Sequence, residues 1–138
     1  MSKKRKVREL AMQVLFVWDA HTQADPDMAR SAVEGGSEDH EVRRAAIEMA
    51  SAAWEQRATS DAWLERLAPQ WPVRRQPGVD RAILRLAVYE LVNSGTPPKV
   101  VIDEAIELAK EFSTEQSPGF VNGVLDAVLK ERNALTGQ

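Results

Sequence analysis

The sequence contains no cysteine among its 138 residues. Disulfide bonds and thiolate chemistry are therefore excluded. Only two histidines are present, His21 and His40, and neither has a partner at the spacing of metal ligands. The phosphate-cradling glycine motif and the nucleophile elbow of many enzymes are also absent. We therefore expect no catalytic residues, no metal site and no cofactor, and predict that the protein is not an enzyme.

Long apolar segments are missing as well. No run of apolar residues approaches the roughly 20 that are needed to span a bilayer. The basic start of the chain is not followed by the continuous hydrophobic stretch of a secretory signal. We therefore expect no membrane association and a cytoplasmic location. A chain of 138 residues suits a single domain that buries roughly two-thirds of its unfolded surface.

Positive charge is concentrated at one end of the chain. The whole sequence has 18 Lys and Arg against 21 Asp and Glu, a formal net charge of −3. Five of these cations lie in residues 3–8, so the remainder has 13 cations against 21 acids, a net −8. This distribution favours a local contact with RNA or DNA over non-specific coating of DNA, where affinity grows with the number of phosphates neutralised. The acidic remainder is free to meet a basic partner.

The basic residues open an amphipathic helix. Apolar side chains recur behind them at helical spacing, at Val7, Leu10, Ala11, Val14, Leu15 and Trp18. A helix start carries partial positive charge and favours Asp or Glu, so five cations there oppose the helix dipole. We interpret them as residues kept for an anionic partner such as nucleic-acid phosphate. The alternative is a frayed, solvated basic tail.

Seven stretches show helical periodicity, and none shows the strict alternation that is typical of a strand. The predicted helices after the first run from about Asp25 to Glu34, from the Ser37-Glu38-Asp39 tract to about Arg57, from Thr59 to before Pro69, from Val79 to Val92, and onward from Pro97-Pro98 and from Ser117-Pro118. We predict an all-α fold of about seven helices in two small helical bundles. The single domain, residues 1–138, has halves at about 1–68 and 78–138, joined by a Pro-rich connector at 69–78.

Several motifs are distinctive when taken together. They are RELAMQVLF at 8–16, VDRAILRLAVYEL at 79–91, PKVVIDEAIELAK at 98–110 and FVNGVLD at 120–126. In this order, and over nearly the whole chain, they resemble the NusB family of bacterial transcription antitermination factors. The resemblance implies an all-helical RNA-binding fold of two small helical bundles, in agreement with the periodicity.

The resemblance also implies partners and a function. NusB-like proteins pair with NusE, which is also a ribosomal protein of the small subunit. The pair binds the boxA element of nascent single-stranded RNA and helps the RNA polymerase elongation complex to read through terminators, notably in ribosomal RNA operons. Some relatives self-associate through the RNA-binding surface, which leaves a homodimer open for this chain.

The resemblance places RNA contacts on the first helix. The arginine-rich start of the family matches Lys4, Arg5, Lys6 and Arg8 of this sequence. We expect these side chains to contact phosphates, which supply affinity and salt dependence but little sequence choice. Gln13 lies about one and a half turns beyond Arg8 and could contact a base edge in single-stranded RNA.

Two phenylalanines are candidates for stacking on bases. Phe16 occupies a position that is often Tyr in the family; its ring could stack on a base, although a core position is an equal alternative. Phe120 is expected in the first turn of the last helix, with Gln116 nearby as a hydrogen-bond donor. The family commonly has a basic residue where this chain has Gly119, so one phosphate contact is lost.

Acidic residues are candidates for contact with the basic NusE partner. Asp80 matches an acidic family position at the start of its predicted helix, which we expect to be exposed. Glu90 is a weaker candidate because its helix phase places it inward, paired with an arginine. Asn122 and Gly123 are expected to serve close helix packing rather than ligand contact.

Two alternatives to an RNA-binding antitermination factor remain at this point. One is a free-standing relative of the N-terminal RNA-binding domain of cytosine-5 RNA methyltransferases, although 138 residues leave no space for a methyl-donor domain and the catalytic cysteine is missing. The other is a helical scaffold that binds only proteins and whose basic start is incidental. Salt-dependent RNA binding that requires Arg5, Lys6 and Arg8 would distinguish an RNA-binding antitermination factor from the scaffold.

Overall fold

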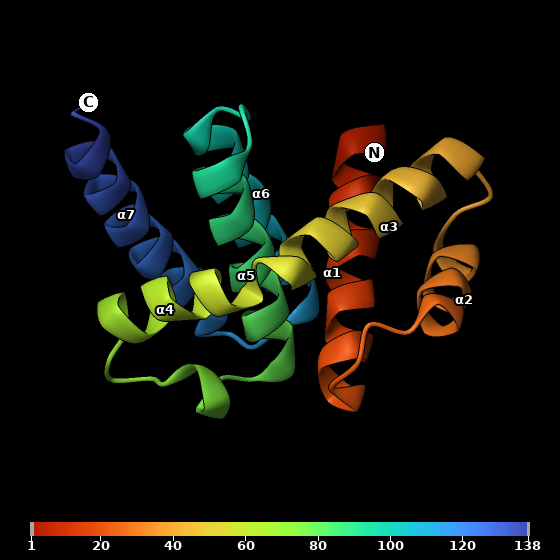
Figure 1. Ribbon diagram of the computed structural model, residues 1–138, viewed down its shortest axis with the longest axis horizontal. Helices are drawn as coiled ribbons and strands as arrows, with labels where there is room; N and C mark the ends of the chain where they lie inside the picture. Colours follow the sequence, from red (N-terminus) through yellow and green to blue (C-terminus); the bar gives the residue numbers. More distant parts are fainter. Residues whose placement is uncertain (1, 138) are drawn as a thin grey trace.

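Helices account for almost all of residues 2–137, the part of the chain that the computed structural model describes (Figure 1). In chain order the elements are α1 (Lys3–His21), α2 (Pro26–Gly36), α3 (His40–Glu55), α4 (Arg57–Leu67), the short 3-10 helix η1 (Val73–Arg75), α5 (Gly78–Asn93), α6 (Pro98–Phe112) and α7 (Ser117–Thr136). Because seven α-helices and no strand are found over that range, the predicted all-α fold is confirmed.

Side-chain caps define the starts of the first three helices. Ser2 Oγ accepts a hydrogen bond from the Arg5 amide at 3.1 Å, and the carboxylates of Asp25 and Asp39 accept amide bonds at the starts of α2 and α3. Such caps satisfy backbone donors that have no partner inside the helix. The predicted starts at the Asp25 and Ser37–Asp39 tracts are therefore confirmed.

The break between α3 and α4 differs from the prediction. Only Gln56 separates the two helices, so α4 begins two residues before the predicted start at Thr59. The Thr59-Ser60-Asp61 sequence looks like a cap, but the Ser60 amide already donates to the Gln56 carbonyl at 3.0 Å. The Ser60 side chain is buried, so tertiary packing has overridden the local preference.

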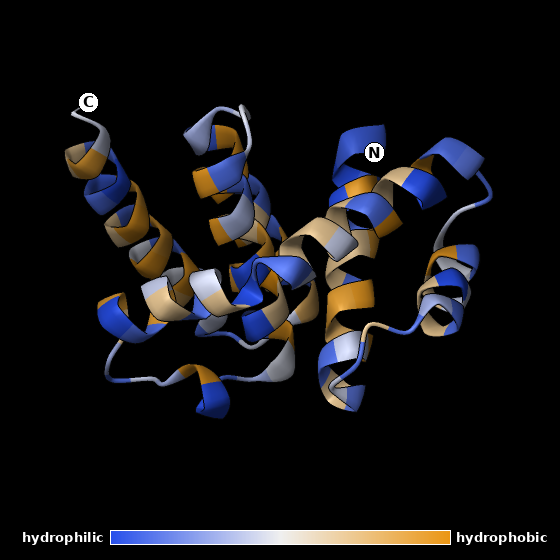
Figure 2. Cartoon of the chain, viewed as in Figure 1, coloured by the Kyte–Doolittle hydropathy of each residue, from blue (hydrophilic) through white to orange (hydrophobic). Residues whose placement is uncertain are grey.

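The helix α5 occupies the centre of the molecule. It packs against five other helices: α1, α3, α4, α6 and α7. In Figure 1 it stands between α1 and α7, with the start of α1 and the end of α7 directed to the same side. Figure 2 shows apolar stripes on these helices and a hydrophilic start of α1. The buried core is one cluster with residues from both sides of the connector, including Leu10, Leu15, Leu84 and Leu125.

A network of ion pairs holds α1, α4 and α5 together beside the connector. Arg81 and Arg85 of α5 both bind Asp19 of α1, at 2.6 and 3.0 Å, and Arg85 also binds Asp61 of α4 at 2.7 Å. Burial lowers the pKa of Arg85, but its hydrogen bonds and its attraction to Asp61 and Asp19 outweigh this and raise it. Arg81 also donates to the connector carbonyl of Val73 at 2.9 Å. The network therefore fixes the connector relative to both halves.

Within residues 2–137, no helix is both long enough and apolar enough to cross a membrane.

Candidate nucleic-acid interface

The cations at the start of α1 are largely paired with carboxylates from other parts of the chain. Lys3 binds Asp39, the N-cap of α3, at 3.1 Å, and Lys6 binds Glu9 one turn along α1 at 2.9 Å. Lys4 is exposed and makes no ion pair with any residue in the 2–137 range. Lys4 is thus the cation of this group that is most available to an external anion.

Arg5 is bound by both oxygens of one carboxylate. Its Nε and Nη2 donate to Glu104 of α6 at 2.9 and 3.1 Å. This bidentate hydrogen bond, with the nearby charges of Glu104, Glu107 and Glu111, raises the pKa of Arg5. The guanidinium remains exposed, so a phosphate that binds Arg5 must compete with Glu104 for the same donors.

Arg8 does not belong to the exposed basic tail, which corrects the prediction that it is a surface phosphate contact. Its side chain is 9% exposed, and its Nε and Nη2 donate to Glu90 of α5 at 3.0 Å. Glu90 is buried, so the prediction that it faces inward and pairs with an arginine is confirmed. Arg8 lies three residues before Ala11 and seven before Leu15, both buried, so its helix phase already indicated an inward position.

Phe16 lies on the surface and not in the core. The residue is 41% exposed, and its ring packs over Gly78 at the start of α5. A Cβ atom on Gly78 would lie 2.9 Å from Cε1 of Phe16, which is closer than such atoms normally approach. The glycine therefore leaves the space that the ring occupies. Gln13, one turn earlier on α1, is half-buried.

Phe120 packs against a residue that the sequence analysis did not single out. Its ring and that of Trp71 have centroids 4.6 Å apart and are tilted by 54°. Trp71 is fixed in turn, because its Nε1 donates to the Arg75 carbonyl and its own carbonyl accepts from the side chain of Gln76, both at 3.1 Å. A tryptophan inside a proline-rich connector was the available indication, but its partner lies 49 positions away. Phe120 is half-buried, so one part of its ring remains open to solvent.

The exposed residues around Phe120 leave space for a ligand. Gln116 is exposed, and its side chain does not cap α7. Gly119 and Gly123 are also exposed, and a Cβ on either would have no atom within 4 Å. The prediction that Asn122 and Gly123 serve close helix packing is therefore wrong, because both face solvent on α7.

Asp80 is completely buried, which corrects its assignment as a contact for a protein partner. Its carboxylate accepts hydrogen bonds from the hydroxyls of Ser113 and Ser117, the latter at 2.9 Å. These serines lie at the end of α6 and the start of α7. Asp80 therefore fixes the turn from which Gln116 and Phe120 project. Ile83 and Leu84, three and four residues further along α5, are core residues and indicated the same inward face.

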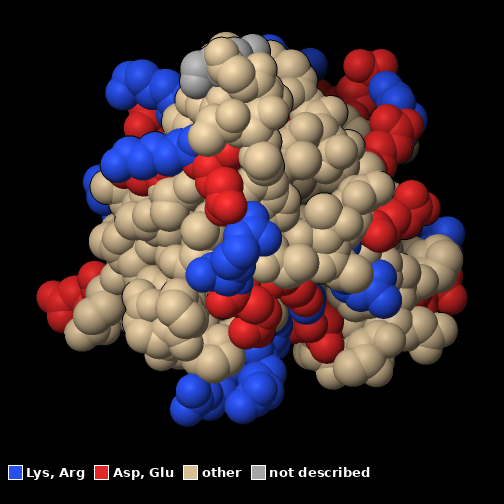
Figure 3. Space-filling view, turned by 60° about the vertical axis from the view of Figure 1, so that its left-hand side comes forward, with Lys and Arg blue, Asp and Glu red and all other residues tan. Residues whose placement is uncertain are grey.

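The predicted site residues fall into two groups. Lys4, Arg5 and Lys6 lie at the start of α1, whereas Phe16 lies eleven residues further along, about 16 Å at the rise of an α-helix. Phe120 joins the second group through the connector, which runs from Trp71 to the glycine under Phe16. In the view of Figure 3, which brings the α4 and α7 side of the molecule forward, basic and acidic side chains are interspersed.

The residues brought together are cations, amides and aromatic rings on an all-helical scaffold. In the described part of the chain, no group of three or more His, Asp or Glu side chains could hold a metal ion. Cations contact phosphates and flat rings stack on bases, so the arrangement is typical of a helical nucleic-acid-binding protein.

Comparison with known proteins identifies the family. The model of the NusB family matches residues 5–130. The transcription antitermination protein NusB of Solibacter usitatus is 44% identical over 133 residues, which cover 95% of this chain and 91% of the relative. NusB of Roseiflexus sp. is 39% identical over 131 residues, with 93% and 92% covered. The chain therefore belongs to the NusB family.

Solved structures have the same fold. A structure of NusB from T. maritima matches with a TM-score of 0.80 and 34% identity, covering 95% of this chain and 92% of that one. A chain in the crystal structure of the antitermination factors NusB and NusE in complex with dsRNA matches with a TM-score of 0.83 and 27% identity, covering 95% and 98%.

Proposed function

We propose that this protein is an RNA-binding transcription antitermination factor that acts together with NusE. The observation that supports this most directly is the match to the NusB family over residues 5–130, with relatives that are antitermination proteins over almost their full length. The similar chain in a complex of NusB, NusE and dsRNA supports NusE and RNA as the two partners. The role is one of binding, without catalysis, in the cytoplasm where nascent RNA is made.

The RNA is expected to contact both groups of exposed residues. Lys4 supplies a phosphate contact directly. Arg5 and Lys6 supply further contacts once their carboxylate partners are displaced. All of these contacts weaken as the salt concentration rises. Phe16 and Phe120 supply ring faces on which unpaired bases stack, each contributing roughly 1–3 kcal/mol. Because stacking requires splayed bases, the preferred ligand is a single strand of the boxA type rather than a duplex.

The same proposal extends to the assembly in which the protein works. NusE binding would recruit the RNA-bound protein to the RNA polymerase elongation complex. Residues 1–138 act as one unit in this scheme, because the buried core draws on both sides of the connector. A homodimer through the RNA-binding surface would hide the basic start of α1 until RNA or NusE competes for it.

Fluorescence anisotropy of a labelled boxA-like RNA, titrated with the protein alone and with NusE, tests the proposal. We expect boxA-like RNA to bind more tightly than a scrambled RNA of the same composition, and NusE to increase that difference. Lys4→Gln should make the negative slope of log affinity against log salt less steep by about one. Equal, weak binding of both RNAs with and without NusE would refute the proposal and leave the helical scaffold.

A further inference from the structure

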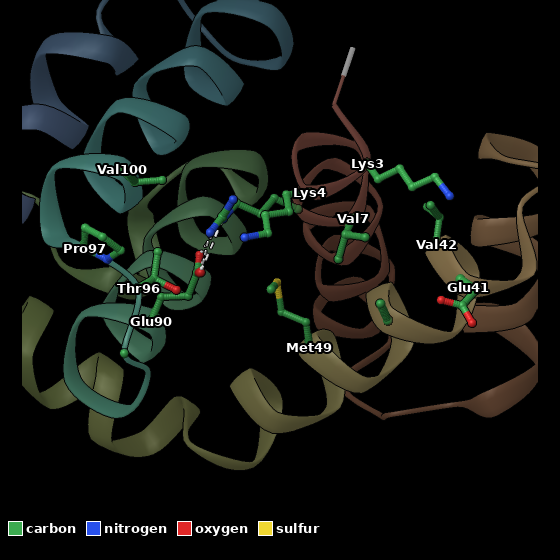
Figure 4. A pocket seen from close by; sticks show the side chains of 13 residues that line it. Lys3, Lys4, Val7, Glu41, Val42, Met49, Glu90, Thr96, Pro97 and Val100 are labelled. Atoms are coloured by element: carbon green, nitrogen blue, oxygen red, sulfur yellow. Dashed lines mark hydrogen bonds and ion pairs between the residues drawn. The ribbon is translucent and has the colours of Figure 1, made fainter.

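A cleft of about 880 Å³ opens between the start of α1, the helix α3 and the turn from α5 to α6 (Figure 4). The apolar part of its lining comes from all three elements: Val7, Val42, Met49, Pro97 and Val100. Val100 is 42% exposed, one of three large hydrophobic side chains left exposed between residues 2 and 137. A cleft of this volume lies within the range of roughly 300–1,000 Å³ that is typical of sites for small organic groups.

Two polar groups on the lining have hydrogen-bonding capacity that the fold does not use. Arg8 binds Glu90 through Nε and Nη2, but its Nη1 makes no hydrogen bond within the described chain. The hydroxyl of Thr96 makes none either over residues 2–137. Because a guanidinium carries five N–H donors, Arg8 can bind a further acceptor and keep its ion pair. Its side chain is nine-tenths buried, so the donor is held in a fixed position.

The cations on the lining of the cleft differ in how far they are neutralised. The lining contains three cations and two carboxylates, namely Lys3, Lys4, Arg8, Glu41 and Glu90. Lys3 is paired with Asp39 and Arg8 with Glu90, so two of the three cations already have a carboxylate partner. Lys4, the lysine without an ion pair in the described range, reaches into the cleft from α1 (Figure 4). An anionic ligand is therefore favoured.

Carboxylates on α6 limit the path of an anion at the start of α1. Arg5 is occupied by Glu104, one turn beyond Val100 on α6, and Glu107 and Glu111 further along that helix are near enough to influence the pKa of Arg5. A phosphate backbone that passed along α6 would meet these three carboxylates, so the electrostatic cost is lower where the phosphate lies at Lys4.

We propose that the cleft is a subsite for one nucleotide of single-stranded RNA, which rests on the RNA binding proposed above. The base lies between Val7, Met49 and Val100, and the adjoining phosphate binds Lys4. The sulfur of a methionine makes favourable contacts with flat aromatic rings. The unused donor of Arg8 binds a carbonyl oxygen on the edge of the base, so uracil and guanine fit better than adenine, which has no carbonyl group.

Two uncharged substitutions test the subsite in the full-length protein. Val100→Gln places a polar side chain in the apolar wall, and Leu135→Gln makes the same kind of change at a 73% exposed position at the end of α7, outside the cleft. With a fluorescein-labelled single-stranded RNA that contains uracil and guanine, we expect Val100→Gln to weaken binding about tenfold, the loss of one base contact. Leu135→Gln should bind as the parent protein does.

The salt dependence separates a base contact from a phosphate contact. Neither substitution changes the charge, so the slope of log affinity against log salt should stay constant for Val100→Gln. RNA that carries 4-thiouridine should also form photo-crosslinks to Met49 or Val100. Equal denaturation midpoints in urea confirm that both variants fold.

The outcomes distinguish this inference from the proposed function. If the parent protein binds RNA but Val100→Gln binds it equally well, the subsite is refuted and antitermination is untouched. If Val100→Gln binds RNA normally but loses affinity for NusE, the cleft is a protein-docking surface and the inference is also refuted. If the parent protein binds no RNA, both proposals fail.

Discussion

Removing one partner of the buried ion pair between Arg8 and Glu90 should lower the free energy of unfolding far more than removing both partners together. The two side chains are 9% and 4% exposed, and the guanidinium binds the carboxylate through Nε and Nη2. Glu90→Leu leaves an uncompensated buried cation, and Arg8→Met leaves a buried carboxylate. Each single substitution should therefore cost roughly 3–5 kcal/mol, a large part of the 5–15 kcal/mol by which proteins of this kind are stable.

The double variant should recover most of that loss. With both charges gone, Met and Leu fill similar volumes and no group is left unpaired, so the pair of changes should be nearly neutral. Urea unfolding, followed by far-UV circular dichroism, measures the difference. With a slope of about 2 kcal/mol/M, each single substitution should lower the midpoint by about 2 M, whereas the double variant should stay near the parent.

The exposed pair Arg44–Glu48 is the matched control. Its side chains are more than 60% exposed and their nitrogen and oxygen atoms are 2.9 Å apart. Arg44→Met and Glu48→Leu, singly or together, should change stability by less than about 1 kcal/mol. If Glu90→Leu costs no more than Glu48→Leu, or if the losses at Arg8 and Glu90 simply add, the argument from burial is refuted.

Three further predictions follow from the interface. Glu104→Gln releases the guanidinium that it binds, so RNA affinity should rise severalfold in the anisotropy titration. Gly78→Ala places a Cβ 2.9 Å from the ring of Phe16 and should cost roughly 1–3 kcal/mol in urea unfolding while weakening RNA binding. The hydrogen bonds from Lys3 and from two backbone amides lower the pKa of Asp39, so its stabilising effect is present at neutral pH and is lost as pH falls through that lowered pKa. NMR titration should show the lowered pKa, and Lys3→Met should move it back toward the ordinary value.

Each of these predictions has a result that contradicts it. Asp103→Asn removes the same charge from α6 without touching Arg5, so an equal gain in affinity would show that Glu104 acts only through the overall charge. An unchanged stability and RNA affinity in Gly78→Ala would mean that Phe16 can move without consequence. An Asp39 pKa that does not respond to Lys3→Met would show that the backbone amides alone lower it.

The number and positions of the helices could be predicted from the sequence because they depend on local features. Apolar residues at helical spacing define each buried face, and Asp25 and Asp39 cap the helices that follow them. Helix phase also indicated correctly that Glu90 faces inward. The same rule applied to Arg8 and Asp80 would have shown that they are buried, so those two errors came from giving charge priority over phase.

The contacts that define the site depend on residues far apart in the chain, and only the tertiary structure decided them. Arg5 meets Glu104 across 99 positions, and Phe120 meets Trp71 across 49. Periodicity states which face of a helix is buried, but not which helix covers it, since that depends on crossing angles and on the packing of the whole core. The sequence by itself therefore determined the helices, their inner faces and the family, whereas the fold decided which cations remain available and where a cleft opens beside them.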